Sequence, residues 1–203
     1  QKLQVRSIMI TGTNGKSTTC KLLQHVLRVN KIDAQLGGNI GKPILDLRIK
    51  KNSTVIIEAS SFQLFYLKFA KPNFATILNI TKDHLDWHGT LKNYQDSKFN
   101  IFSKQDQRDY SLLSKENLVK KYKRKLFKGK LIKIQAGIIK KSLGRLIKNK
   151  YLLSQPNLEN ISFVYKLSNI FKIKKNIFLN ALNTFKGLPH RNETFYRKNK
   201  ITF

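Results

Sequence analysis

The chain has 203 residues, enough for one domain with a small appendage, and 40% of them are hydrophobic, so a buried core can form. Its one cysteine, Cys20, excludes an internal disulfide, and no apolar run approaches the length of a membrane span, so we expect a cytoplasmic location without membrane insertion. The net charge of +29 comes from lysines spread over every segment, which favours a solvated surface over a specific nucleic-acid site, although a basic nucleic-acid-binding domain remains a weaker alternative.

A strand, a glycine-rich turn and a helix are predicted near the beginning of the chain. The apolar run 7–11 precedes the turn 12–18, and apolar residues at helical spacing continue to about Val29. The turn is Gly12-Thr13-Asn14-Gly15-Lys16-Ser17-Thr18. Its glycines permit a tight turn with inward N–H groups, the helix N-terminus adds partial positive charge, and Lys16 adds a full charge. The turn is therefore expected to bind polyphosphate.

The hydroxyl groups of Ser17 and Thr18 indicate which polyphosphate the turn would bind. Either hydroxyl can bind a magnesium ion that bridges the terminal phosphates, and this favours ATP over a simple phosphate ester. Ile10 stands where the standard pattern has an additional glycine, so this is the shortened G-x-x-G-K-S form. The alternative is a glycine-rich turn without a ligand.

Strand-length apolar runs alternate with helix-period segments through the first half of the chain. The predicted strands at 54–57 and 74–78 are followed by predicted helices at 62–69 and 91–102. This alternation predicts an α/β fold with a mostly parallel sheet flanked by helices. Ligands of such sheets gather at the carboxyl ends of the strands, which here lead into 12–18, Glu58 and 79–84.

Two side chains at these strand ends are candidate magnesium ligands. Glu58 ends the run 54–57, so the sheet should bring its carboxylate to the same edge as the phosphate loop. A surface or helix-capping glutamate is the alternative. His84 follows the next strand, but a lone histidine in that place is more typical of a structural hydrogen bond.

Lys98 is the most unusual charge in the sequence. It follows Leu91 by seven residues and Tyr94 by four, so it falls on the apolar face of the predicted helix 91–102. Burial lowers the pKa of an amine, and a neutral amine can add carbon dioxide to form a carbamate, which resembles a carboxylate. The alternative is a lysine whose stem lies along the apolar surface while its ammonium reaches water.

The second half of the chain is less informative. Residues 103–156 are basic and weakly periodic, with one possible short strand at 130–134. Two further helices are predicted, at about 157–171 and 175–185, with Gly187 as the C-cap of the second.

These segments together resemble the Mur ligase family, over nearly the whole chain. The matching residues are Thr11-Gly12-Thr13-Asn14-Gly15-Lys16-Ser17-Thr18, Gly37-Gly38-Asn39-Ile40-Gly41-Lys42-Pro43, Glu58-Ala59-Ser60-Ser61-Phe62-Gln63-Leu64, Leu78-Asn79-Ile80, Asp83-His84-Leu85-Asp86, Lys98, Asn157, Asn160, Phe185-Lys186-Gly187-Leu188-Pro189-His190-Arg191 and Glu193. The resemblance implies a P-loop NTPase-like central domain over 1–188 and the start of a truncated C-terminal ligase domain over 189–203. It also implies that flanking domains complete the enzyme and that this chain alone is inactive.

The resemblance implies an ADP-forming ligase that adds D-glutamate to UDP-N-acetylmuramoyl-L-alanine through an acyl phosphate, in peptidoglycan synthesis. The segments 37–41 and 60–64 favour this member of the family over another Mur ligase or a folylpolyglutamate synthase, which remain alternatives. The implied cofactors are ATP and Mg²⁺, and we expect a monomer.

The resemblance also assigns roles to residues. It implies that residues 12–18 bind the ATP phosphates, that Asn157 and Asn160 face the adenine, and that Arg191 contacts the phosphates. Ser17 and Glu58 would bind one magnesium ion, and His84 with carbamylated Lys98 a second, so that Lys16, His84 and Lys98 form the catalytic set. Asn39, Ser60 and Gln63 would contact the muramoyl substrate. Pro156 departs from the family pattern, which has a histidine directly before the first asparagine.

Overall fold

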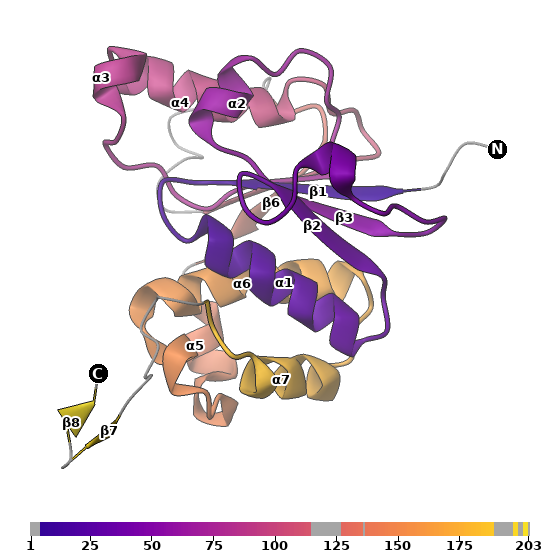
Figure 1. Cartoon of the computed structure of the whole chain (residues 1–203), viewed down its shortest axis with the longest axis vertical. Helices are drawn as coiled ribbons and strands as arrows, with labels where there is room; N and C mark the ends of the chain where they lie inside the picture. The colour runs from indigo at the N-terminus through magenta and orange to yellow at the C-terminus, as the bar shows by residue number, and fades with distance from the viewer. Residues whose placement is uncertain (1–4, 115–126, 136, 189–196, 199–200, 203) are drawn as a thin grey trace.

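A computed structural model describes residues 5–114, 127–135, 137–188, 197–198 and 201–202. Its centre is a parallel sheet (Figure 1). The sheet has six strands in the order β2-β3-β1-β4-β5-β6. The strands are β1 (Arg6–Thr11), β2 (Ala34–Gly38), β3 (Thr54–Glu58), β4 (Phe74–Ile77), β5 (Tyr110–Ser114) and β6 (Lys130–Ile134). The predicted α/β fold with a parallel sheet is confirmed.

Helices cover both faces of this sheet. The helices are α1 (Lys16–Val29), α2 (Ser61–Phe65), α3 (Leu85–His88), α4 (Leu91–Phe99), α5 (Ile138–Ser142), α6 (Gln155–Ile170) and α7 (Lys175–Thr184), with 3₁₀ turns at Ile44–Asp46, Asn100–Phe102, Gly144–Leu146 and Lys150–Leu153. Figure 1 shows α1, α5, α6 and α7 on one side of the sheet and α2, α3 and α4 on the other. Within the described ranges, no helix has both the length and the apolar character needed to cross a bilayer.

The alternation of side chains along β1 explains the two helical layers. Ile8 and Ile10 belong to the apolar cluster that contains the buried faces of α1, α6 and α7. Met9 points to the opposite face, where it joins a smaller cluster with Ala75 and Phe102. Because both faces of a parallel sheet are covered, its central strand is apolar at successive positions, and this is the run that the sequence displays at 7–11.

Several predicted boundaries change. The predicted helix 62–69 is shorter, since α2 ends at Phe65 and the exposed Tyr66 and Phe69 offer it no further face to bury. The predicted helix 91–102 consists of α4 and the 3₁₀ turn Asn100–Phe102. The proposed short strand 130–134 is confirmed as β6.

The prediction that Gly187 caps the last helix is wrong. Helix α7 ends at Thr184, and its C-cap is Phe185 in an extended conformation. Gly187 has a φ of +83° and packs against the ring of Tyr151, where an added Cβ would lie 3.1 Å from a ring carbon. It therefore serves a close approach between two segments rather than the end of a helix.

The predicted division at residue 188 stays a prediction. Residues 189–196, 199–200 and 203 lie outside the described part of the chain, and Arg191 is among them. Beyond residue 188 the structure describes a short antiparallel pair, β7 (Arg197–Lys198) with β8 (Ile201–Thr202).

Candidate functional site

The phosphate loop connects the end of β1 with the start of α1, as the sequence predicts. Gly15 is the N-cap of α1 at a φ of 82°, and a Cβ there would lie 2.4 Å from Asn160 Oδ1, so both conformation and space require glycine. The loop is also tied to the end of β4, because Thr13 N donates to Asn79 O at 3.0 Å and Asn14 N donates to Asn79 Oδ1 at 2.9 Å. These contacts hold the turn in a fixed shape.

Lys16 and Ser17 occupy the first turn of α1. The Lys16 ammonium donates to Gly12 O at 2.9 Å and to Thr13 O at 2.8 Å, so its charge lies over the loop. Phosphate oxygens form stronger, charge-assisted hydrogen bonds with an ammonium than carbonyl oxygens do. Ser17 is half-buried, whereas Thr18 is buried. Of the two hydroxyls that the sequence offered to a magnesium ion, the structure favours Ser17.

Glu58 lies beside this loop, at the end of β3 and next to Ile10 of β1 in the sheet register. Its side chain is buried, with 2% of its surface exposed. Asn39 Nδ2 donates to Oε1 at 2.9 Å, while Oε2 is buried and has no hydrogen-bond partner among the residues that the structure describes. An unsatisfied buried carboxylate oxygen is unfavourable by itself, and a metal ion is one group that would satisfy it. The alternative of a surface or capping glutamate is wrong, since Ser60 is the cap of α2.

Lys98 is buried against the beginning of the loop. It is 1% exposed, and its Nζ donates to Gly12 O at 3.0 Å and to Thr11 Oγ1 at 3.4 Å. Burial, together with the nearby charge of Lys16, lowers the pKa of Lys98 from 10.5 to about 7, and Asp83 opposes part of this shift. The prediction that Lys98 points inward is confirmed, and the alternative in which its ammonium reaches water is wrong. With a pKa of about 7, about half of the amine is neutral at pH 7, whereas in water the neutral fraction would be on the order of one in a few thousand.

Tyr94 connects the phosphate loop with Lys98, a role that sequence reasoning missed. Its hydroxyl lies 3.0 Å from Thr13 Oγ1, and Lys98 Nζ lies 4.7 Å from the centre of its ring. Burial raises the pKa of the Tyr94 phenol, so the hydroxyl remains protonated near neutral pH. The sequence did contain a signal for this role, because Tyr94 precedes Lys98 by four residues on the same helix face. In the sequence pattern, Tyr94 served only as an apolar residue that defines this face.

His84 lies near these groups but is more exposed. It is the N-cap of α3 with a φ of 49°, and its Nε2 lies 3.4 Å from Asp83 Oδ2. Its ring packs against Phe62 at 4.9 Å and against Tyr94 at 6.3 Å between ring centres. Tyr94 therefore lies against both His84 and Lys98, the two residues proposed for a second metal.

The asparagine pair on α6 has two different environments. Asn160 is buried against Gly15 of the phosphate loop. Asn157 Nδ2 donates to Tyr151 O at 2.7 Å, so this side chain fixes the segment before α6. Asn160 thus lies against the phosphate loop, while nucleotide and adenine contacts by either asparagine remain predictions.

The three residues predicted to contact the muramoyl substrate have structural contacts of their own. Asn39 orients the Glu58 carboxylate, as described above. Ser60 and Gln63 form a capping box at the start of α2, in which Gln63 N donates to Ser60 Oγ at 3.2 Å and Ser60 N donates to Gln63 Oε1 at 2.9 Å. The box places both side chains close to the carboxyl end of β3, where a substrate of this site would lie.

The residues present fit a magnesium ion that is bound mainly by phosphate. Within the described residues, no three histidine, cysteine, aspartate or glutamate side chains gather as a metal cluster. Magnesium commonly takes one or two protein oxygens together with substrate phosphates and water. The unpartnered Oε2 of Glu58 and the hydroxyl of Ser17 meet that requirement next to the loop.

Comparisons with known proteins point to one family. Residues 10–174 match the Mur ligase middle domain. UDP-N-acetylmuramoylalanine--D-glutamate ligases from Pseudothermotoga lettingae and Rickettsia bellii are 33% and 34% identical to the chain over 201 and 217 residues, and each alignment covers 97% of it. The alignments cover 46% and 48% of the relatives, so the chain spans about half the length of the curated relatives it matches.

Solved structures show the same fold. MurF from Acinetobacter baumannii superposes with a TM-score of 0.74 at 15% identity, covering 97% of this chain and 49% of that one. MurF ligase from Thermotoga maritima in complex with ADP superposes with a TM-score of 0.71 at 17% identity, covering 97% of this chain and 52% of that one. At such low sequence identities, these superpositions show that the fold is shared and nothing more.

Proposed function

The chain belongs to the Mur ligase middle domain family, and from that membership we propose that it is the ATP-using part of an ADP-forming ligase. The proposed reaction adds D-glutamate to UDP-N-acetylmuramoyl-L-alanine during peptidoglycan synthesis, in the cytoplasm. The observation that carries the proposal is the arrangement at the carboxyl end of β1. There the phosphate loop contacts a buried lysine of lowered pKa and lies near a buried carboxylate, one oxygen of which has no partner among the described residues.

The choice of D-glutamate rests on the curated relatives. They are 30–34% identical to the chain and carry the name of the D-glutamate ligase. Folylpolyglutamate synthase and the other Mur ligases stay alternatives at the level of fold, since the Escherichia coli FolC structure with ADP is 14% identical. The ADP in that structure and in the Thermotoga maritima MurF complex supports nucleotide binding by a protein of this fold.

ATP is proposed to bind along residues 12–18. Backbone N–H groups of the loop and the N-terminus of α1 would bind the β- and γ-phosphates, and the Lys16 ammonium would move from the loop carbonyls to phosphate oxygens. Asn160 would support the loop through Gly15, and Asn157 and Arg191 complete the proposed nucleotide contacts. Ser17 and Glu58 would bind one Mg²⁺, which draws charge from the phosphate oxygens when bound.

Lys98 is proposed to act as a carbamate. The neutral amine adds carbon dioxide through a new N–C bond and releases one proton, which leaves a carboxylate-like anion. The lowered pKa of Lys98 supplies the neutral amine that this addition needs. This anion and His84 would bind a second Mg²⁺, and Tyr94, which lies near both side chains, would help to hold them in place.

The chemistry follows from phosphoryl transfer. The carboxylate of the muramoyl-alanine substrate attacks the γ-phosphorus, the bond to ADP breaks, and an acyl phosphate results. The amine of D-glutamate then attacks the acyl carbon, phosphate leaves, and an amide forms. Negative charge spreads over the phosphate oxygens in the transition state. Lys16, which the loop holds in position, would stabilise that charge. Asn39, Ser60 and Gln63 would orient the acceptor.

The proposal includes the domain division predicted from the sequence, in which residues 1–188 are the ATP-binding domain and 189–203 begin a ligase domain. It also includes flanking domains and a monomeric state. The weaker alternative, a nucleic-acid-binding domain, would show as salt-sensitive binding that is indifferent to sequence and unaffected by the phosphate loop.

Nucleotide binding by this chain tests the first half of the proposal. Titration calorimetry with ATP and Mg²⁺ should give one saturable site, and Lys16→Ala should weaken the affinity at least tenfold. Lys21→Ala is the matched control, because Lys21 lies on the same helix outside the loop. Equal affinity in Lys16→Ala and Lys21→Ala would reject the site.

A chimera tests the second half. The chain would replace the matching segment of the Rickettsia bellii ligase, and the product would be assayed with the muramoyl-alanine nucleotide, ATP and D-glutamate. D-glutamate-dependent release of ADP that Lys16→Ala removes is the expected result. A folded chimera that releases ADP with another acceptor or amino acid, and not with these, would favour the alternatives.

A further inference from the structure

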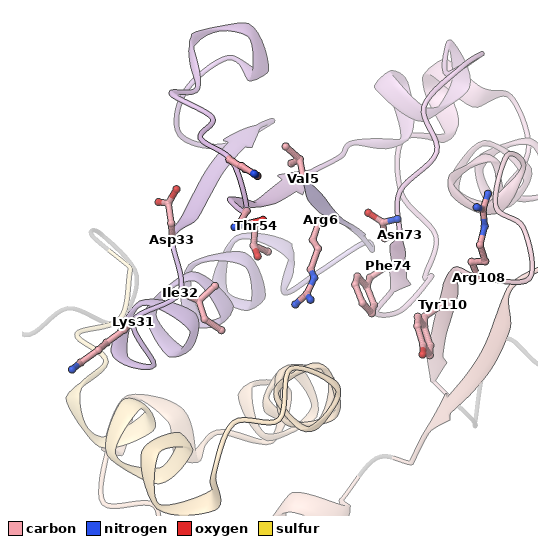
Figure 2. A pocket seen from close by; sticks show the side chains of 12 residues that line it. Val5, Arg6, Lys31, Ile32, Asp33, Thr54, Asn73, Phe74, Arg108 and Tyr110 are labelled. Carbon is pink, nitrogen blue, oxygen red and sulfur yellow. The ribbon is translucent and has the colours of Figure 1, made fainter. Parts of the chain in front are cut away.

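A cavity of about 720 Å³ lies at the edge of the sheet opposite to the phosphate loop. Its wall is formed by the first residues of β1, β3, β4 and β5 and by the turns that precede β2 and β3 (Figure 2). The phosphate loop follows the carboxyl end of β1, whereas this cavity surrounds the amino end. The two sites are therefore separated by the length of the strands. The volume falls within the range of about 300–1,000 Å³ that is typical of small-molecule sites.

Positive charge dominates the lining. It contains Arg6, Lys31, Lys51 and Arg108 against one carboxylate, that of Asp33. Arg108 is paired with Asp106 at 2.9 Å. Asp33 accepts hydrogen bonds from Ser53 and Gln35, which lower its pKa.

Three of these cations have no carboxylate partner among the described residues. In the described part of the chain, Arg6, Lys31 and Lys51 form no ion pair. A concave surface that holds several unpaired cations attracts an anion more strongly than scattered surface lysines do.

Arg6 is the most fixed of these cations. Its guanidinium lies 5.5 Å from the centre of the Phe171 ring, which holds the side chain by a cation–π contact. Figure 2 shows the side chain extending from the start of β1 between Thr54 and Phe74. Beside it, the rings of Phe74 and Tyr110 stack at 5.1 Å and give the cavity one flat apolar wall.

The turns at the rim are also fixed. Lys31 follows the end of α1 with a φ of 59°, and its N–H donates to Arg28 O at 2.9 Å. Lys51 precedes Asn52, which has a φ of 69° in the turn closed by Ser53 N and Lys50 O at 3.1 Å. Because the backbone of these turns is already ordered, ligand binding would cost little backbone entropy.

We propose that this cavity binds a small phosphorylated molecule, separate from the ATP site. Arg6 presents planar donors that match phosphate oxygens, and Lys31 and Lys51 add charge at the rim. The stacked Phe74 and Tyr110 rings would lie against the organic part of the ligand. The volume of about 720 Å³ favours a ligand of nucleotide size over a nucleic-acid strand.

The test uses pyrophosphate and AMP as probes, without Mg²⁺, in 0.15 M KCl. Lys16→Ala serves as the background, so that binding at the phosphate loop is weakened at least tenfold. Titration calorimetry should detect one saturable site for each probe in that background. Adding Arg6→Gln or Lys51→Gln should weaken it at least tenfold. Adding Lys50→Gln should change it less than twofold, since Lys50 is the sequence neighbour of Lys51 and lies outside the lining.

The control variants distinguish a specific binding site from general attraction of an anion to the positively charged surface. Exposed charges are screened beyond about 8 Å at this salt concentration, so Lys50 and Lys51 should differ only if a specific contact forms. Equal losses in the Lys50→Gln and Lys51→Gln variants, or no saturable binding of either probe, would overturn the proposal. Thermal unfolding of each variant checks folding, and if Arg6→Gln unfolds through lost packing on Phe171, Lys51→Gln decides alone.

Discussion

Replacing Lys98 with methionine tests the burial of this amine directly. Methionine keeps the unbranched shape of the side chain and removes its charge. Gly12 O would keep a donor in the variant, because Lys16 also donates to it at 2.9 Å. The variant therefore changes the protonation behaviour of the site more than its hydrogen bonding.

The sign of the effect follows from the lowered pKa. Between about pH 7 and 10.5 the unfolded chain holds the proton on Lys98 and the folded chain has lost it. The free energy of unfolding of the parent should therefore rise with pH in this window, while below pH 7 the full penalty of burying the ammonium is present. For a shift from 10.5 to about 7, the rise attributable to Lys98 between pH 7 and pH 9 is on the order of 2 kcal/mol.

The measurement is urea unfolding of the parent and of Lys98→Met at pH 7, 8 and 9, in buffers free of carbon dioxide. The methionine variant should be the more stable protein at pH 7, and its advantage should shrink by about 2 kcal/mol at pH 9. Lys92→Met is the matched control on the same helix, since the Lys92 side chain is 82% exposed. Parallel pH curves for the parent and Lys98→Met would refute the reasoning.

Three further outcomes follow from the site. Glu58→Gln should leave the stability of the chain unchanged or higher, because it removes the charge from an unsatisfied buried oxygen, and should remove the Mg²⁺ dependence of ATP binding measured by calorimetry. Gly15→Ala should lower the free energy of unfolding by about 1–3 kcal/mol in urea titrations, since alanine at a φ of 82° also meets Asn160. The 203-residue chain alone should bind ATP and form no D-glutamyl product in a radiolabel assay, because it spans about half of its relatives, and lost positioning of two reactants can cost about 7–11 kcal/mol.

Local patterns account for the parts of the structure that the sequence predicted. The turn 12–18 needs glycine at fixed places and lies between a strand and a helix, so its fold follows from short-range chemistry. The inward position of Lys98 follows from helical spacing alone. Both features depend on residues within one or two turns of each other, and such features are the ones that a sequence pattern can express.

Features that depend on distant partners were missed. β2 carries two glycines and a glutamine, and β5 lies in a region of weak periodicity, so neither has the pattern of a buried strand, although pairing with a neighbouring strand orders each of them. The contacts of Asn39 with Glu58 and of Tyr94 with Thr13 join residues 19 and 81 positions apart. Only the three-dimensional structure brings them together.

The two buried ionisable side chains beside the phosphate loop are best understood together, as parts of one binding site. Glu58 and Lys98 are each almost fully buried, and within the described residues neither forms an ion pair with the other or with a third group. Either charge alone lowers stability, because burial without a partner disfavours an ion. Both surround a loop suited to a polyphosphate, where Glu58 would meet a magnesium ion and Lys98 would supply a second anion after it adds carbon dioxide. Burying these charges lowers the stability of the ligand-free chain, but it also makes the site selective. Phosphate alone would be repelled by the Glu58 carboxylate, and a metal ion alone would be repelled by the Lys16 ammonium. The site should therefore favour phosphate and metal together.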